Sequence, residues 1–217
     1  MRLTKHAHAC LELLDGGERV IIDPGVYTAP MNGMTNVKAI VITHQHDDHC
    51  WEEQLERIIA LNPDVPIYAP SDVCERLSKA PHPEQYNTVE VHHGDLHLAG
   101  AFQLEFFGEM HAEIHRSIPL VQNCGVMVND ELYYPGDSFT RPDRPVAVLA
   151  CPSSAPWLKI GEVIDFVDDV KPGLSFATHN IHLSEQGHQM NNGRIQALTE
   201  RHGGQFRFLQ VGEVLDY

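Results

Sequence analysis

The segment Thr43–His49 holds three histidines and two aspartates in seven residues, directly after the apolar run Ala39–Ile42. Imidazole nitrogen and carboxylate oxygen are ligands that borderline divalent cations such as zinc bind, and a site without thiolates usually keeps one coordination position for water. Without a cation, such a cluster would suffer carboxylate repulsion and leave buried imidazoles without partners. This segment, called the histidine motif below, therefore predicts a metal site at the end of a strand.

The spacing within the histidine motif indicates which side chains can share a cation. His44 and His46 are two residues apart, so in an extended segment their side chains point the same way and can hold one ion. Asp48 and His49 lie on the turn that follows and can reach a second ion nearby.

The pattern His-x-His-x-Asp-His at residues 44–49 resembles the signature of the metallo-β-lactamase fold superfamily of binuclear metallohydrolases. Four further residues match that superfamily in order, each after an apolar or aromatic run: Asp23, His111, Asp137 and His179. Short motifs alone give false positives, so the ordered set is a stronger signal than the motif by itself. The resemblance covers nearly the whole chain and points to a lactonase-like branch, similar to ascorbate-phosphate lactonases.

The resemblance implies a role for each matching residue. Six side chains would hold two metals in two sets, His44, His46 and His111 for the first and Asp48, His49 and His179 for the second. Asp137 would bridge the metals, and Asp23 would fix the ligand loop without touching them. A metal-bridging hydroxide would attack the substrate, and Asp48 would be the catalytic residue that moves a proton to the leaving group.

Strand-like runs and helical spacings alternate along both halves of the chain. We expect strands at 11–14, 20–22, 37–42, 67–69, 89–93, 102–107, 125–128, 132–134, 146–150 and 206–211. We expect helices that begin near Asp47 or Asp48, at Ser71 or Asp72, at Ile160 and at Ser184. This order predicts an α/β fold with two mixed sheets packed face to face and helices outside, the four-layer αββα sandwich that the resemblance implies. Residues 1–217 are expected to form one domain, because no linker interrupts them.

The composition limits the partners of the chain. A formal charge of −15, from 30 acidic residues against 15 Lys plus Arg, argues against a broad nucleic-acid or membrane-binding surface. The five cysteines form no Cys-x-x-Cys pair, which is typical of reduced thiols in a cytoplasmic protein. We therefore expect a small-molecule substrate, no nucleic acid and no membrane. A compact chain without an appended substrate domain is also compatible with a homo-oligomer.

Five more residues are candidates for the substrate pocket, each with an ordinary structural alternative: His8, His115, His182, Ser153 and Trp157. His115 competes with His111 for one ligand position, and the family spacing favours His111. His8 resembles the start of lactonase-like chains, although Ala7 stands where a glycine is expected. For His182, Ser153 and Trp157, the sequence allows either a position in the pocket wall or an ordinary position in a loop or the core.

The leading prediction is a metal-dependent hydrolase that acts on a small molecule. An anion is one candidate for this substrate. The bond would be that of a lactone, phosphoester or amide. Two divalent metals would be the cofactors, zinc first, although manganese and iron suit the same ligands. Two alternatives stay open at this point. One is a metal-binding or ligand-sensing module of the same fold without turnover, and the other is a mononuclear-iron enzyme that depends on oxygen.

Overall fold

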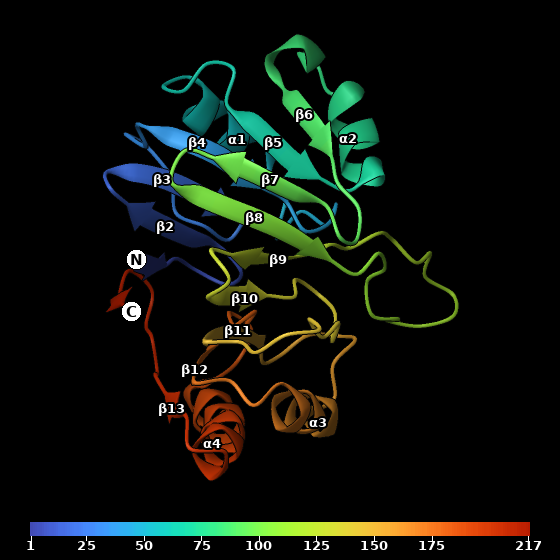
Figure 1. The fold of residues 1–217 in the computed structure, drawn as a ribbon. Coiled ribbons are helices and arrows are strands. Elements are labelled where there is room, and N and C mark those ends of the chain that lie inside the picture. Colours follow the sequence, from blue (N-terminus) through green and yellow to red (C-terminus); the bar gives the residue numbers. More distant parts are fainter.

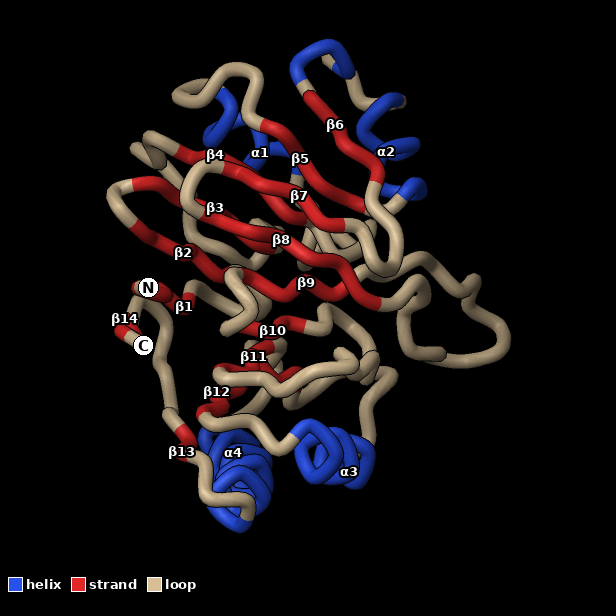
Figure 2. Tube along the Cα trace, viewed as in Figure 1, coloured by secondary structure: helices blue, strands red, loops and turns tan.

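The computed structural model describes residues 1–217 as two mixed sheets of seven strands each, with helices on their outer faces (Figure 1). The four-layer αββα prediction is therefore confirmed. Figure 2 shows the helices in two groups at opposite ends of the molecule, one on each sheet. None of these helices combines the length and the apolar character needed to cross a bilayer.

The first sheet comes mostly from the N-terminal half. Its order is β14 (Val214–Asp216), β1 (Arg2–Lys5), β2 (Leu11–Asp15), β3 (Glu18–Ile22), β4 (Val37–Val41), β5 (Pro66–Ala69) and β6 (Asn87–Glu90). Strands β14 to β3 pair antiparallel, whereas β3 to β6 pair parallel. The outer face of this sheet is covered by α1 (Glu52–Ile59) and α2 (Ser71–Ser78), and the short 3-10 helix η1 (Pro83–Gln85) precedes β6.

The second sheet repeats this arrangement. Its order is β13 (Gln205–Phe206), β12 (Leu174–Thr178), β11 (Val148–Pro152), β10 (Leu132–Tyr134), β9 (Gly125–Val128), β8 (Phe102–Phe107) and β7 (Leu96–Ala99). Strands β7 to β10 are antiparallel and β10 to β13 parallel. Its outer face is covered by α3 (Ile160–Val170) and α4 (Glu185–Arg201).

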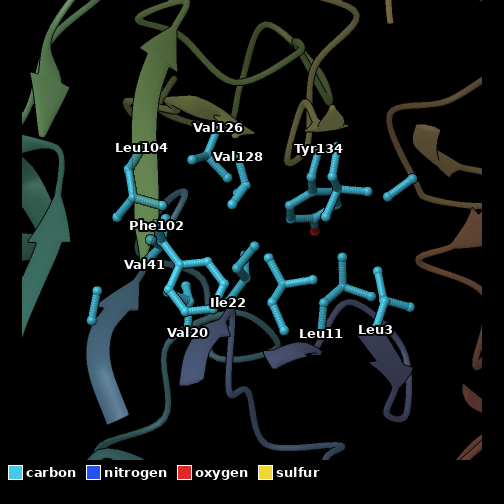
Figure 3. Packing of buried hydrophobic residues seen from close by; sticks show 14 of the residues in the cluster. Leu3, Leu11, Val20, Ile22, Val41, Phe102, Leu104, Val126, Val128 and Tyr134 are labelled. Atoms are coloured by element: carbon cyan, nitrogen blue, oxygen red, sulfur yellow. The ribbon is translucent and has the colours of Figure 1, made fainter. Parts of the chain in front are cut away.

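The main core lies between the two sheets, where 24 buried residues form one cluster (Figure 3). Side chains alternate across a strand, so Val20 and Ile22 of β3 face this cluster. Ile21, between them, faces the layer of α1 and α2 instead. The alternation explains why the strands next to the helices are apolar on both faces.

The structure corrects several element boundaries. The first helix begins at Glu52 and not at Asp47 or Asp48, because the amides of His49 and Cys50 both donate to the His46 carbonyl in a separate turn. The second helix begins at Ser71, as expected, but its N-cap is Pro70, so the expectation that Ser71 or Asp72 caps it is wrong. Ser71 and Asp72 instead bond the side chain of Gln122.

Of two elements expected near the C-terminus, the helix is confirmed and the strand is not. The helix expected at Ser184 begins there, and the Ser184 hydroxyl accepts a hydrogen bond from the Gly187 amide. The strand expected at 206–211 is wrong, because β13 is limited to Gln205–Phe206 and a turn closed by Gln210 and Glu213 follows. Strands β1, β7 and β14 were not anticipated, because each has only three or four residues and this is too short for a clear pattern.

The topology brings the carboxyl ends of several strands to one edge of the sandwich. The histidine motif follows β4, and Asp23 follows β3 in the same sheet. From the second sheet, His111 follows β8, Asp137 follows β10 and His179 follows β12. Because each of these strands points toward the same edge, residues far apart in the sequence meet there.

Candidate metal centre

Three overlapping groups of possible ligand atoms lie at this edge, and one of them, His44, His49 and Asp137, joins residues of the other two regions. The nitrogens of His44, His46 and His111 form one group, with every pair of atoms within 4.8 Å. Nε2 of His44 and Nδ1 of His46 are only 3.0 Å apart. The structure therefore brings together the three side chains predicted for the first metal.

The second group contains the side chains predicted for the other metal. Asp48, His49 and His179 have their ligand atoms within 4.8 Å of one another, and His8 joins them. Oδ2 of Asp48 lies 3.4 Å from Nε2 of His179 and 3.8 Å from Nε2 of His49. Asp48 is also the most accessible member, because a quarter (25%) of its side chain is exposed whereas His49 and His179 are buried.

Asp137 lies between the two groups. Its Oδ2 is 3.4 Å from Nε2 of His111 and 3.1 Å from Nε2 of His179, and its Oδ1 is 3.3 Å from Nε2 of His49. Trp157 donates a hydrogen bond from Nε1 to Oδ2 at 2.8 Å. A buried carboxylate that contacts nitrogens of both groups occupies the place that a bridging ligand requires.

Three imidazoles have their tautomers fixed by acceptors at Nδ1. His49 donates from Nδ1 to Oδ2 of Asp23 at 2.7 Å, His111 to the carbonyl of Ala112 at 2.5 Å, and His179 to the carbonyl of Ser154 at 2.6 Å. Each Nε2 is then a lone-pair acceptor that points into the cluster. All three Nε2 atoms are buried without a hydrogen-bond partner, which fits a cation as the missing partner.

The same argument applies to His44. The hydroxyl of Thr43 donates to Oδ2 of Asp23 at 2.7 Å, so its oxygen accepts the hydrogen bond from Nδ1 of His44 at 3.1 Å. Nε2 of His44 is therefore a lone pair facing Nδ1 of His46. Two imidazole lone pairs at this distance repel unless a proton or a cation lies between them, and this again fits a metal.

Asp23 holds several residues of this network in place through hydrogen bonds. Its side chain is fully buried and accepts hydrogen bonds from the amide and hydroxyl of Thr43 and from Nδ1 of His49. Its backbone is left-handed, with φ of 48°, an uncommon conformation outside glycine. After it, Gly25 passes so close to the backbone of Asp48 that a Cβ atom at Gly25 would lie 1.8 Å from the carbonyl oxygen.

His8 connects the second group to the first strand. The amide of Ile181 donates to Nδ1 of His8 at 3.4 Å, so the neutral ring carries its hydrogen on Nε2 and donates to Oδ2 of Asp48 at 3.0 Å. Burial lowers the pKa of His8 to about 4, against the effect of Asp48, so the ring is neutral at pH 7. His8 therefore acts on Asp48 as a hydrogen-bond donor and is a poor candidate for a metal ligand.

The charges in the cluster are arranged to keep the carboxylates ionised. Burial opposes the charge of Asp137, but the positive charge of protonated His179 and His49, whose own pKa values Asp137 raises, holds the pKa of Asp137 well below the usual range. A bound cation would supply this positive charge while both rings stay neutral. The pKa of Asp48 is also lowered, because hydrogen bonds and the nearby imidazoles outweigh its burial. Burial, followed by the neighbouring His49, lowers the pKa of His44, so this ring is neutral, the form that binds a metal.

The other candidate residues fall in different places. His182 is exposed, and its ring lies 5.8 Å from that of His8. His115 is exposed and bonded to the Ser117 hydroxyl, away from the ligands. Ser153 is fully buried and donates to the Thr178 carbonyl, so it has no surface to offer a substrate.

Several contributors to the site were missed by sequence reasoning. Asn123 is buried and accepts from the amide of Asp137 at 2.9 Å, while its own amide group donates to the carbonyl of Pro135. Tyr27 is 40% exposed and packs edge-on against His8 and His182. Neither residue stands in a motif, and only their position in space connects them with the metal centre.

Comparison with known proteins agrees with this geometry. The family model for the β-lactamase superfamily domain matches residues 2–179. Protein Rv0786c of Mycobacterium tuberculosis is 32% identical over 204 residues, which are 92% of this chain and 93% of that protein. A UPF0173 metal-dependent hydrolase of Anoxybacillus flavithermus is 26% identical over 110 residues, 49% of this chain and 44% of that protein.

The fold is shared with solved structures. Igni18, a metallo hydrolase from the archaeon Ignicoccus hospitalis, superposes with a TM-score of 0.72 at 14% identity, covering 100% of this chain and 98% of that one. The family match spans both sheets and reaches from the first strand to His179. The chain therefore belongs to the β-lactamase superfamily and has the metallo-β-lactamase fold, the fold whose signature its histidine motif resembles.

Proposed function

We propose that this protein is a hydrolase of small molecules that works with two divalent cations, zinc first among them. The coarser prediction, a metal-dependent hydrolase of the metallo-β-lactamase superfamily, is supported by the family match and by the names of the relatives. The two-cation mechanism is supported by one observation above the others. Asp137 lies within 3.4 Å of imidazoles from both ligand groups.

His44, His46 and His111 would hold one cation, and Asp48, His49 and His179 the other, with Asp137 shared between them. Bound cations of this kind lower the pKa of coordinated water from ~16 toward ~7 and polarise a carbonyl or phosphoryl oxygen. The chain supplies the fixed orientation of the ligands, through the acceptors at Nδ1 of His49, His111 and His179.

Asp48 is the residue proposed to move the proton. Its Oδ2 accepts from Nε2 of His8 and faces His49 and His179, which leaves Oδ1 free of these contacts. A quarter of the Asp48 side chain is exposed (25%), so a substrate can reach this residue. Oδ1 of Asp48 would take a proton from the attacking water and pass it to the leaving group.

The substrate class follows from chemistry and charge. Cations that polarise a carbonyl or phosphoryl group suit a lactone, a phosphoester or an amide. The net charge of −15 supports a small-molecule substrate over a nucleic acid or an anionic membrane. A cytoplasmic setting is supported by the five free cysteines, four of them buried.

The test uses a panel of lactones, phosphodiesters, amides and thioesters with protein loaded with zinc, manganese or iron. We expect hydrolysis that a chelator abolishes, that the metal restores, and that proceeds equally with and without oxygen. His111→Ala should remove turnover, whereas His115→Ala, a matched histidine four residues away and outside the cluster, should keep it. Turnover that requires oxygen, or metal-loaded protein inactive on the whole panel, would reject the proposal in favour of an oxygen-dependent enzyme or a sensing module.

A further inference from the structure

Lys5, the last residue of β1, is a buried cation without an acidic partner. Its side chain is 1% exposed, it takes part in no ion pair, and its ammonium donates only to the carbonyl of His6, at 3.3 Å. Lysine is almost never fully buried unless it is paired, because an ammonium loses its hydration in the interior. Burial lowers the pKa of Lys5 to about 8, and the side chain is still mostly cationic at pH 7.

A cavity of about 390 Å³ has Lys5 among its lining residues. It lies between the end of β1, the start of α4 and residues 208–211. No aspartate or glutamate lines it, although the chain has 30 acidic residues. A cavity that contains a cation and excludes carboxylates has the charge that attracts an anion.

The other polar side chains of the cavity can each donate a hydrogen bond. The amide side chains of Asn180 and Gln210 line it, together with His188. Nδ1 of His188 is buried without a partner. The remaining wall is apolar, and Phe208 and Val211 are 51% and 64% exposed. A cavity lined by both polar and apolar residues fits a ligand that has an acidic group and an apolar body.

We propose that this cavity, called the Lys5 cavity below, binds a small organic anion, with Lys5 holding its carboxylate or phosphate and Phe208 and Val211 covering its apolar part. The acidic group is the partner that the ammonium lacks within the chain. The binding step makes and breaks no covalent bond.

The Lys5 cavity adjoins the candidate metal centre through one residue. His8 lines the cavity and also donates to Asp48 at 3.0 Å. Ile181, whose amide bonds Nδ1 of His8, lines the same cavity. An anion held by Lys5 is therefore next to the side chain that orients Asp48, either as the remote acidic end of a substrate or as a separate effector.

The test measures binding and not turnover. Isothermal titration of the full-length protein with 3-phenylpropionate should show a single site, and the neutral alcohol 3-phenylpropan-1-ol should bind about tenfold more weakly or not at all. Lys5→Met should weaken the binding of 3-phenylpropionate by about tenfold or more. The matched control Lys159→Met removes the same charge from a side chain that is 86% exposed, and should leave the affinity unchanged.

Unchanged affinity in Lys5→Met, or equal binding of the alcohol, would overturn the proposal. Unchanged affinity in Lys5→Met would show that the carboxylate binds elsewhere, for example on a metal. Equal binding of the alcohol would show that the cavity selects only for an apolar body. Competition separates the two sources of the anion. If the cavity holds the acidic end of the substrate, 3-phenylpropionate will compete with the substrate for binding. If the cavity holds a separate effector, 3-phenylpropionate will bind without displacing the substrate. A protein that binds the anion through Lys5 but hydrolyses nothing would refute only the proposed function.

Discussion

Asp23 accepts a hydrogen bond from Nδ1 of His49 at 2.7 Å, with both side chains fully buried, and this contact turns Nε2 of His49 toward Asp137. Replacing such a partner of a metal-binding histidine typically reduces metal affinity or activity by about 10-fold to 100-fold. Asp23→Asn should therefore weaken zinc binding by this factor, as measured by competition with a chromogenic chelator. Asp47→Asn, in the same loop but 63% exposed, is the control and should bind zinc normally. Equal affinities in the two variants would contradict the role of Asp23.

His8 should affect turnover and not metal content. Because His8 donates to Asp48 without being needed as a ligand, His8→Ala should lower kcat by about 10-fold to 100-fold and leave the number of bound metals unchanged. His8→Gln, whose amide can donate a similar hydrogen bond, should recover part of kcat. Steady-state kinetics with parallel elemental analysis makes the distinction. Loss of a metal ion in His8→Ala would show that His8 is a ligand.

The candidate ligand set could be collected from the sequence because its members occur in short motifs, each after an apolar or aromatic run. His44 and His46 closely follow β4, and Asp137 and His179 follow strands that are mostly buried. The contributions of Asn123 could not be predicted, since a buried amide that holds the Asp137 backbone has no local pattern.

Long-range pairing also limited the fold prediction. Strand β14 exists because Leu215 pairs with Leu3, more than two hundred residues away in the sequence, and a strand of three residues carries no signal of its own. The same limit applies to Lys5. In the sequence it is one of two basic residues near the N-terminus, and its burial depends on the packing of segments that are distant in the sequence.

Gly25 should be intolerant of any side chain. A Cβ atom there would lie 1.8 Å from the backbone oxygen of Asp48, so Gly25→Ala should force the two loops apart and destabilise the protein by about 1–3 kcal/mol or more. Gly161→Ala in α3 meets nothing within 4 Å and should be neutral or stabilising by up to about 1 kcal/mol. Urea unfolding of both variants tests this expectation, and equal stabilities would contradict it.

Lys5 should reduce the stability of the protein at neutral pH. Its pKa is about 8 in the folded state, against ~10.4 for a free lysine, so at pH 7 folding must bury the charge. As pH rises from 8 to about 10, the folded state releases the proton before the unfolded state does, and the stability of the native protein increases.

Lys5→Met removes this cost. The variant should be more stable than the native protein by about 1–3 kcal/mol at pH 7, and the difference should shrink as pH approaches 10. Urea unfolding at several pH values measures the difference. A variant less stable than the native protein at pH 7 would show that the ammonium is satisfied within the chain.

The two-cation centre is tested most directly by titrating zinc into metal-free protein under anaerobic conditions and measuring hydrolysis of the best panel substrate at each step. Because Asp137 contacts imidazoles of both ligand groups, we predict that turnover rises until two zinc ions are bound per chain and then stays constant. Turnover that is complete with one ion per chain, or that is absent until oxygen is admitted, would contradict the account.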